Sequence, residues 1–143
     1  MSQSEVTREA SNEVETLLGK WYRCKDDSEC REAWKAVLEY LANNWIYLVG
    51  WSQFEAWGAY YVSPDLKRCI YIGRNLRTDP ITRWIDKVTF NDPAELANRI
   101  WRNQGGTVPF KKIRERIKDV FGVDVEMDQK NKLIRALFGE ASE

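Results

Sequence analysis

The sequence predicts an α+β fold in which a small three-stranded antiparallel sheet, at about residues 45–74, lies between N-terminal helices and a C-terminal helical region. Three observations lead to this class. Apolar residues recur at helical spacing before residue 44 and after residue 92. Between those stretches, short runs rich in β-branched and aromatic residues favour strands. A chain of 143 residues, 43% of them hydrophobic, is also long enough for one domain with a buried core.

The single domain is predicted to have three parts: a helical part at 1–44, a sheet-plus-helix core at 45–104 and a basic helix pair at 105–143. In the first part, helices are expected at about 4–19 and 29–43, and Ser28 is expected to cap the second one. Their buried faces are predicted to carry Val6, Ala10, Val14, Leu17, Leu18 and Trp21 in the first helix, and Ala33, Trp34, Val37, Leu38 and Leu41 in the second.

Three strands are predicted in the middle of the chain, at 45–51, 55–63 and 68–74. The last two are joined by Pro64-Asp65-Leu66-Lys67, a turn sequence typical of an antiparallel hairpin. Alternate positions on the first strand are expected to share one face and to be buried against the first two helices. Stacking on single-stranded bases and a subunit interface are the alternatives for these side chains. The residues concerned are Trp45, Tyr47, Val49 and Trp51.

Four helices are predicted after the sheet. Asp79-Pro80 resembles an N-cap followed by proline, which predicts a short helix with Trp84 and Ile85 facing inward. A short strand is expected at 87–90, and Asp92 begins a helix that ends before Gly105-Gly106. The last two helices, near 109–121 and 127–138, are separated by Gly122. Two helices with a basic face also weakly indicate a helix-turn-helix regulator that binds DNA as a dimer.

Charge is balanced overall but uneven along the chain. There are 22 basic and 22 acidic residues, yet residues 99–118 hold seven basic residues and one acidic residue. Such a stretch favours salt-dependent binding of phosphate, and a solvated helix face is the alternative. The longest apolar run, Trp45 to Trp51, is too short to cross a bilayer, and the first residues are polar. No membrane association and a cytoplasmic location are therefore expected.

Cysteine and histidine usage narrows the chemistry. The odd number of cysteines (Cys24, Cys30 and Cys69) favours reduced thiols inside a cell, with a Cys24–Cys30 disulfide as the alternative. The chain contains no histidine, which excludes Ser-His-Asp catalysis and histidine-ligated metals. Any catalysis therefore depends on tyrosine, arginine, lysine or carboxylates.

A tyrosine and glycine pattern carries the strongest functional indication. Gly58-Ala59-Tyr60 lies in the first strand of the hairpin and Tyr71-Ile72-Gly73 in the second, and Arg83 precedes Trp84 further on. In this order and spacing, residues 58–104 resemble the GIY-YIG endonuclease superfamily. The resemblance implies that the two tyrosines position the attacking water and that Arg83, or alternatively Arg77, grips the phosphate.

The same resemblance implies a magnesium ion held by a glutamate on the helix that begins near Asp92. The aligned position is Asn98, so the nearest acid, Glu95, is the expected ligand. DNA is the expected partner, and its backbone is expected to contact basic residues after the hairpin and in the C-terminal pair. These are Arg74, Arg77, Lys111, Lys112, Arg114 and Lys118.

The predicted function is thus a small Mg²⁺-dependent DNA endonuclease, or a catalytically degenerate derivative that only binds DNA; whether the protein is an enzyme stays open. The alternative is a non-enzymatic assembly protein, of the kind found among viral accessory proteins: a structural nucleoprotein or an inhibitor of a larger enzyme complex. Seven tryptophans in 143 residues favour an extensive protein interface or an oligomer.

Overall fold

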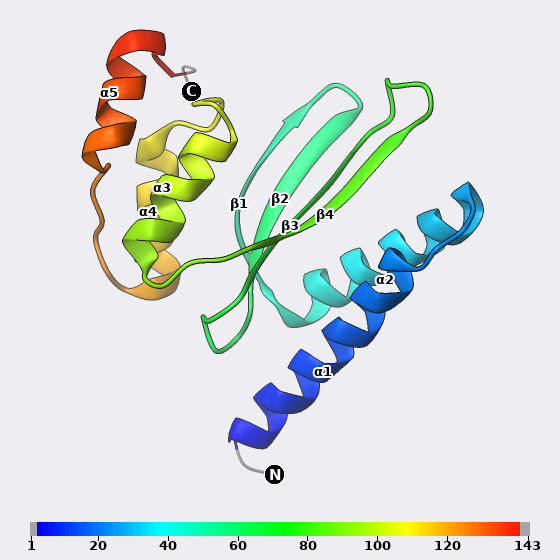
Figure 1. Ribbon diagram of the computed structural model, residues 1–143. Helices are drawn as coiled ribbons and strands as arrows, with labels where there is room; N and C mark the ends of the chain where they lie inside the picture. Colours follow the sequence, from blue (N-terminus) through cyan, green and yellow to red (C-terminus); the bar gives the residue numbers. More distant parts are fainter. Residues whose placement is uncertain (1–2, 141–143) are drawn as a thin grey trace.

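The computed structural model describes the backbone of residues 3–140 and the side chains of residues 13–140. A four-stranded antiparallel sheet lies between two groups of helices, with α1 and α2 on one face and α3, α4 and α5 on the other (Figure 1). The elements are α1 (Gln3–Tyr22), α2 (Asp27–Asn44), β1 (Ile46–Gln53), β2 (Ala56–Val62), β3 (Cys69–Asn75), β4 (Thr82–Val88), α3 (Pro93–Asn103), α4 (Phe110–Phe121) and α5 (Gln129–Phe138). The predicted α+β class is therefore confirmed.

The sheet has one strand more than predicted. Its order is β1-β2-β3-β4, so each strand pairs with its sequence neighbour. The short helix expected after Asp79-Pro80 is wrong, because residues 82–88 form β4 and pair with β3. Trp84 and Ile85 point to opposite faces of the sheet, as strand alternation requires, whereas a helix would have buried them together. Of the strand expected at 87–90, only residues 87 and 88 belong to a strand, where they form the end of β4.

The first two helices form an antiparallel pair that covers one sheet face, called here the α1–α2 face. Val14 and Leu18 of α1 and Val37 of α2 pack against Ile70 and Ile72 of β3. The predicted helices are confirmed, although Val6 and Ala10 lie outside the described side chains. The predicted cap is wrong by two residues, because Asp26 accepts the backbone hydrogen bond of Glu29.

A disulfide joins Cys24 and Cys30 across the turn between α1 and α2, and Cys69 is free and buried. The Cys24–Cys30 disulfide, which was the alternative, is thus present. The expectation that all three cysteines are reduced thiols is wrong. Disulfides are typical of oxidising compartments, so this pair does not support the predicted cytoplasmic location. In the part of the chain that the structure describes, no helix is both long and apolar enough to cross a membrane.

An irregularity in β1 changes which face its aromatic residues occupy. The pairing of β1 with β2 shifts between Tyr47 and Val49, a bulge that reverses the alternation. Trp45 is buried with α1 and α2 as predicted, and Tyr47 packs edge-on against Tyr61. Val49 and Trp51 instead lie on the opposite face, so the four residues do not share one face.

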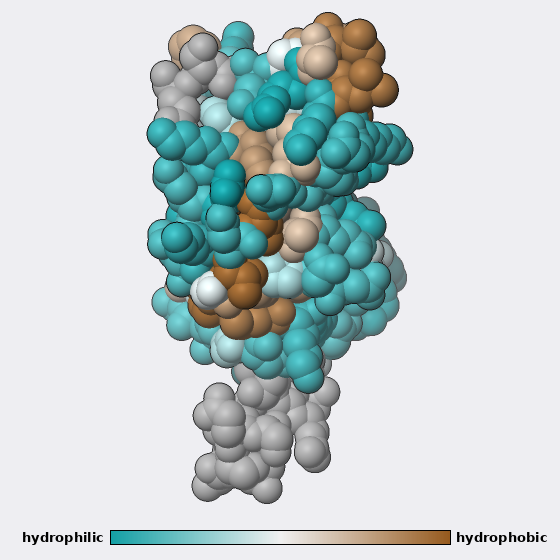
Figure 2. All heavy atoms as spheres, turned by 90° about the vertical axis from the view of Figure 1, so that its left-hand side faces the viewer, coloured by the Kyte–Doolittle hydropathy of each residue, from teal (hydrophilic) through white to brown (hydrophobic). Residues whose placement is uncertain are grey.

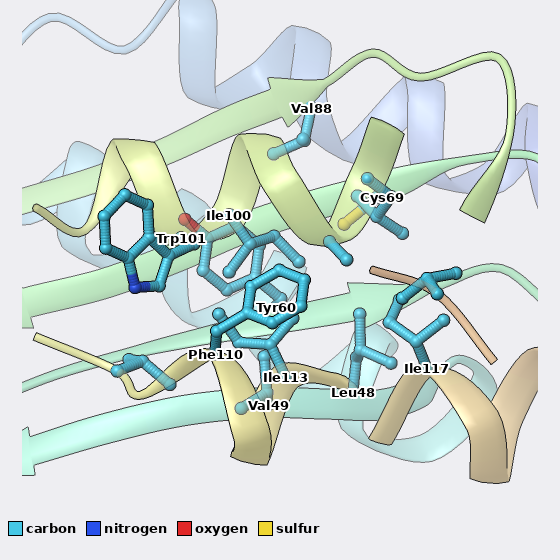
Figure 3. Close-up of a cluster of buried hydrophobic side chains, with 14 of the residues drawn as sticks. Leu48, Val49, Tyr60, Cys69, Val88, Ile100, Trp101, Phe110, Ile113 and Ile117 are labelled. Carbon is cyan, nitrogen blue, oxygen red and sulfur yellow. The ribbon is translucent and has the colours of Figure 1, made fainter. Parts of the chain in front are cut away.

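The second core fills the opposite face, called here the α3–α4 face (Figure 3). Tyr60, Cys69 and Val88 of the sheet meet Trp101 of α3 and Ile113 of α4, and all are buried. The helices predicted at 109–121 and 127–138 are confirmed. The helix-turn-helix interpretation stays a prediction. Hydrogen bonds from Asp128, the N-cap of α5, and from Asn131 attach α5 to α3.

Candidate functional site

Tyr60 and Tyr71 form the centre of the α3–α4 face. They are opposite each other on β2 and β3, and their rings stack with centroids 4.3 Å apart. Gln104, just after α3, donates to the Tyr60 hydroxyl at 2.6 Å and accepts from the Tyr71 hydroxyl at 3.3 Å. Trp51 Nε1 donates to the Tyr71 hydroxyl at 2.8 Å. The predicted tyrosines are therefore side by side, inside a hydrogen-bond network that holds them in place.

The environment keeps both tyrosines protonated. Burial is the largest influence and raises the pKa of Tyr60 well above its ordinary value, and it raises the pKa of Tyr71 as well. Nearby Asp86 raises both values further, while the hydrogen bond from Trp51 lowers the pKa of Tyr71. A phenol with a raised pKa is a poor base at neutral pH. These hydroxyls are suited to hydrogen bonding rather than to deprotonating water.

This arrangement makes a testable prediction about alkaline pH. Both hydroxyls should resist ionisation. Their share of the absorbance change at 295 nm, taken as the difference between the wild type and Tyr60→Phe or Tyr71→Phe, should develop above the pH at which unfolded tyrosine titrates, about 10. The pKa values of Tyr60 and Tyr71 are higher in the folded state than in the unfolded state. The stability that results is therefore fully present below pH ~10 and is lost as the pH rises through the folded-state pKa values. Tyr60→Phe should remove one late-titrating group. If the signal lost in Tyr60→Phe or Tyr71→Phe titrated at the unfolded value in the native protein, this network would be contradicted.

Two glycines explain how large rings lie flat on the sheet. Gly58 and Gly73 are paired across β2 and β3, and Trp51 and Trp84 flank them in the same row. A side chain at Gly58 would meet Trp51 Nε1 and the Tyr71 hydroxyl, and one at Gly73 would meet the Trp84 ring. The sequence pattern of glycines and tyrosines therefore has a direct packing role.

The two tryptophan rings make a continuous surface over these glycines. Their planes are 17° from parallel and their centroids are 6.3 Å apart, and Tyr71 lies beside Trp84 with centroids 6.0 Å apart. We call Trp51, Tyr71 and Trp84 the aromatic floor. Both tryptophans are half-buried, and Trp84 belongs to neither hydrophobic core. The floor therefore continues the α3–α4 face beyond the part that the helices cover.

The structure does not bring Arg83 to the tyrosines. Arg83 lies on the α1–α2 face of β4, where its guanidinium donates to Asp27 of α2 at 3.1 Å. Arg74, its neighbour across β3 and β4, lies on that same face. The sheet itself separates these arginines from Tyr60 and Tyr71. The alternative, Arg77, is in the loop after β3, with its guanidinium 5.2 Å from the Phe54 ring.

The Glu95 carboxylate is held by two neighbouring side chains. It accepts from Arg99 at 3.1 Å and from Asn91 at 3.3 Å, within α3 and the turn before it. Among the described residues, no group of three or more potential metal-binding side chains comes together. The magnesium site with a single glutamate that the resemblance implies stays a prediction.

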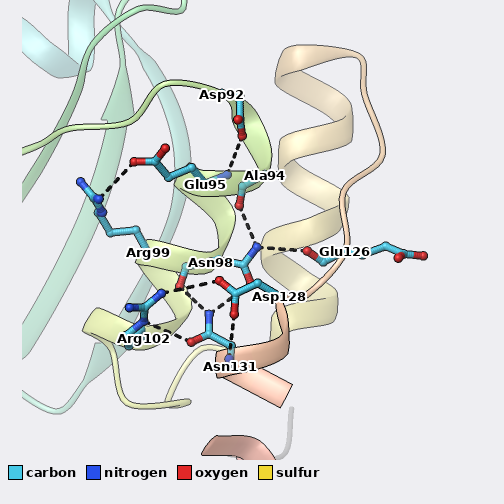
Figure 4. A network of polar contacts seen from close by, with 9 residues as sticks. All are labelled: Asp92, Ala94, Glu95, Asn98, Arg99, Arg102, Glu126, Asp128 and Asn131. Carbon is cyan, nitrogen blue, oxygen red and sulfur yellow. Dashed lines mark hydrogen bonds and ion pairs between the residues drawn. The ribbon is translucent and has the colours of Figure 1, made fainter. Parts of the chain in front are cut away.

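Asn98, at the position aligned with the expected metal ligand, has a structural role (Figure 4). It is buried, and its Nδ2 donates to the carbonyls of Ala94 at 2.8 Å and Glu126 at 3.0 Å. Its Oδ1 accepts from the backbone N–H of Asp128 at 2.8 Å and from Asn131 Nδ2 at 3.1 Å. This network attaches the segment before α5 to α3.

The predicted basic face of α4 is only partly available to a ligand. Arg114 forms two 2.7 Å hydrogen bonds with Asp124, which lower the pKa of Asp124. Arg116 donates to the carbonyls of Leu48 at 2.7 Å and Tyr47 at 2.9 Å, at the edge of β1. The remaining predicted residues of this helix are exposed and make none of the described ion pairs: Lys111, Lys112 and Lys118.

Sequence reasoning missed a second group on the α1–α2 face. Trp34, Arg31 and Lys35 of α2 line a cavity together with Trp57 and the arginines of β3 and β4. The turn at Pro64–Lys67 sets the register that places Trp57 opposite Arg74, so that pair could be predicted from the sequence. The side chains that α2 contributes could not be predicted, because their place depends on how the helix packs against the sheet.

No family model, curated protein or solved structure matches this chain. The functional conclusion therefore depends on the geometry of the site.

Proposed function

We propose that this protein binds single-stranded DNA through the aromatic floor and does not cleave it. One observation carries the proposal: the Trp51 and Trp84 rings lie almost parallel over Gly58 and Gly73, on a part of the sheet face that the helices leave half-exposed. Flat aromatic rings on a sheet surface provide stacking positions for unpaired bases. This corresponds to the non-catalytic alternative within the predicted DNA-binding function.

Cations near the floor can contact the phosphates of a bound strand. An open hollow of about 770 Å³ is bordered by Trp51 and by Lys112 of α4. Phe54, whose side chain is 87% exposed at the tip of the β1–β2 hairpin, holds Arg77 over its ring. Aromatic side chains interleaved with basic ones are typical of single-strand binding surfaces.

The arrangement favours binding over catalysis. Both tyrosine hydroxyls have raised pKa values, and Arg83 is on the opposite side of the sheet. A phosphodiester at the tyrosines would therefore lack both an effective base and the arginine that the resemblance assigns to it. Stacking needs neither of these groups.

The test is fluorescence anisotropy with a fluorescein-labelled oligo(dT). Trp84→Ala is expected to weaken binding about 10-fold, near the lower end of the ~1–3 kcal/mol that base stacking contributes. The slope of log affinity against log salt should stay unchanged, because the variant removes no charge. Lys112→Gln should instead reduce that slope by about 0.7.

Tyr22→Ala is the matched control, because Tyr22 is an exposed aromatic residue on α1, which covers the opposite face of the sheet. Circular dichroism and thermal unfolding of each variant separate loss of binding from loss of fold. Metal-dependent nicking of plasmid by the wild type would overturn the non-catalytic part of the proposal. Equal affinity of the wild type and Trp84→Ala would overturn the role of the floor.

A second candidate, self-assembly, is favoured by one observation on α5. Leu137 and Phe138 are 67% and 83% exposed, and Leu133 is exposed on the same helix. Figure 2, which views the molecule from the α5 side, shows apolar atoms gathered at its top and along this face. Sedimentation velocity over a concentration series tests this: a dimer abolished by Leu137→Lys would support assembly, and a monomer throughout would oppose it.

A further inference from the structure

A cavity of about 500 Å³ lies on the α1–α2 face, on the side of the sheet opposite the aromatic floor. It is formed between α2 and strands β2, β3 and β4. We call it the arginine cleft, and its lining residues are Arg31, Glu32, Trp34, Lys35, Leu38, Trp57, Arg74 and Arg83. Four of the eight are basic and one is acidic, so the cleft has a net positive charge.

Two arginines face each other across adjacent strands in this cleft. Arg74 of β3 is directly opposite Arg83 of β4 in the sheet register. Like charges at directly opposed positions destabilise a sheet unless an anion lies between or beside them. The Arg83 side chain is only 10% exposed, which increases the cost of leaving its charge without a partner.

Among the residues whose side chains are described, one carboxylate, that of Asp27, pairs with these two guanidinium groups. Asp27 accepts from Arg83 at 3.1 Å, and the Asp27 side chain is 78% exposed, so water weakens this ion pair. Arg74 makes no ion pair with any residue that the structure describes, and its Nε is buried without a hydrogen-bond partner. Glu32, the acidic lining residue, lies 3.7 Å from Arg31. The cleft therefore holds a buried guanidinium nitrogen whose hydrogen-bonding capacity is not satisfied.

Aromatic side chains form the wall beside the arginines. Trp34 is buried and Trp57 is half-buried, and their ring centroids are 5.8 Å apart. Trp57 is paired with Arg74 across β2 and β3, so its ring and the guanidinium belong to the same cross-strand row. A ligand that presents an anion to the arginines can thus place a planar group against Trp57.

We propose that the arginine cleft binds a phosphate group, and that its aromatic wall favours a phosphate carried by a nucleoside. The planar guanidinium groups of Arg74 and Arg83 match the oxygens of a phosphate, to which arginine donates paired hydrogen bonds. Lys35 and Arg31, which are exposed at the cleft, add positive charge around the anion. The proposal does not depend on the aromatic floor, because the two surfaces are on opposite faces of the sheet.

The experiment is isothermal titration calorimetry at low salt with AMP, inorganic phosphate and adenosine. We expect AMP to bind more tightly than phosphate, and adenosine to bind far more weakly than AMP. Equal affinity for AMP and phosphate would still support a phosphate site but would identify the free anion as its ligand. Failure of both AMP and phosphate to bind would overturn the proposal.

Arg74→Gln should lower AMP affinity at least about 10-fold, because hydrogen bonds to a charged group are lost. It should not lower the melting temperature of the unliganded protein, because Arg74 has no described ion pair to lose. If this variant nevertheless failed to fold, Lys35→Gln, on the exposed rim, should lower AMP affinity several-fold. Lys111→Gln on α4 is the matched control. Unchanged AMP affinity in the cleft variants would overturn the assignment.

Oligo(dT) separates this site from the proposed function. Arg74→Gln is expected to leave oligo(dT) affinity unchanged, and Trp84→Ala to leave AMP affinity unchanged. Absence of oligo(dT) binding together with normal AMP binding would reject the floor and retain the cleft. If Arg74→Gln weakened both ligands equally, a single continuous surface would bind both, which would overturn the inference of a separate phosphate site.

Discussion

Gly73→Ala is expected to lower the free energy of unfolding by about 3 kcal/mol, the upper end of the usual cost of overpacking. A Cβ atom at this position would meet the backbone carbonyl of Trp57 on β2 and the ring of Trp84 on β4. The ring can turn aside, but the carbonyl belongs to the neighbouring strand and cannot move without disturbing the sheet. The loss should be measured by urea denaturation.

Gly19→Ala provides the matched control for this substitution. Gly19 lies within α1, where an added Cβ meets only the flexible end of the Arg23 side chain. Alanine is a better helix former than glycine by about 1 kcal/mol, so this variant should be neutral or more stable. Wild-type stability in Gly73→Ala would show that the glycine is not required for packing and would strengthen a catalytic interpretation of the motif.

Asn98→Ala is expected to cost about 3 kcal/mol, because it leaves buried polar groups without partners. The carbonyl of Glu126 and the backbone N–H of Asp128 would each lose a hydrogen bond, and each unsatisfied buried group costs about 1–3 kcal/mol. Since Asn131 bonds to the same side chain, the attachment of α5 to α3 should loosen as well.

Hydrogen exchange should locate this loosening in the segment before α5 and in α5 itself, with less change in the sheet. Asn103→Ala is the control, because Asn103 is an exposed asparagine on the same helix. Little change in stability in Asn98→Ala would contradict the structural role of the network. Binding of oligo(dT) should persist in the folded fraction, because Asn98 is not part of the aromatic floor.

The helices and the hairpin were predictable because their signals are local. Helical spacing predicted α1 and α2, and Asp92-Pro93 predicted the start of α3 through capping chemistry that involves only neighbouring residues. The turn at Pro64–Lys67 brought Tyr60 and Tyr71 together as expected. These features depend on residues close together in the chain.

The errors arose where distant pairing overrides a local preference. Asp79-Pro80 has the chemistry of a helix start, but hydrogen bonding with β3 makes the following residues a strand. That strand carries Arg83 to the face opposite the tyrosines and Trp84 to the same face. Because neighbouring residues of a strand point to opposite faces of the sheet, Arg83 lies away from the two tyrosines whereas Trp84 lies beside Tyr71. The bulge in β1 had a similar effect on Tyr47 and Trp51.

The amino-acid sequence was enough to establish the α+β class, the antiparallel hairpin and the paired tyrosines, because periodicity and turn chemistry act over short distances. It could not establish which helix covers which sheet face, since that depends on the packing of α2 and α3 against strands far away in the chain. The packing of α2 places Trp34 beside Arg74 and Arg83, and β4 completes the aromatic floor with Trp84. Both proposed binding surfaces thus arise from contacts between distant segments, where burial rather than local preference determines the arrangement.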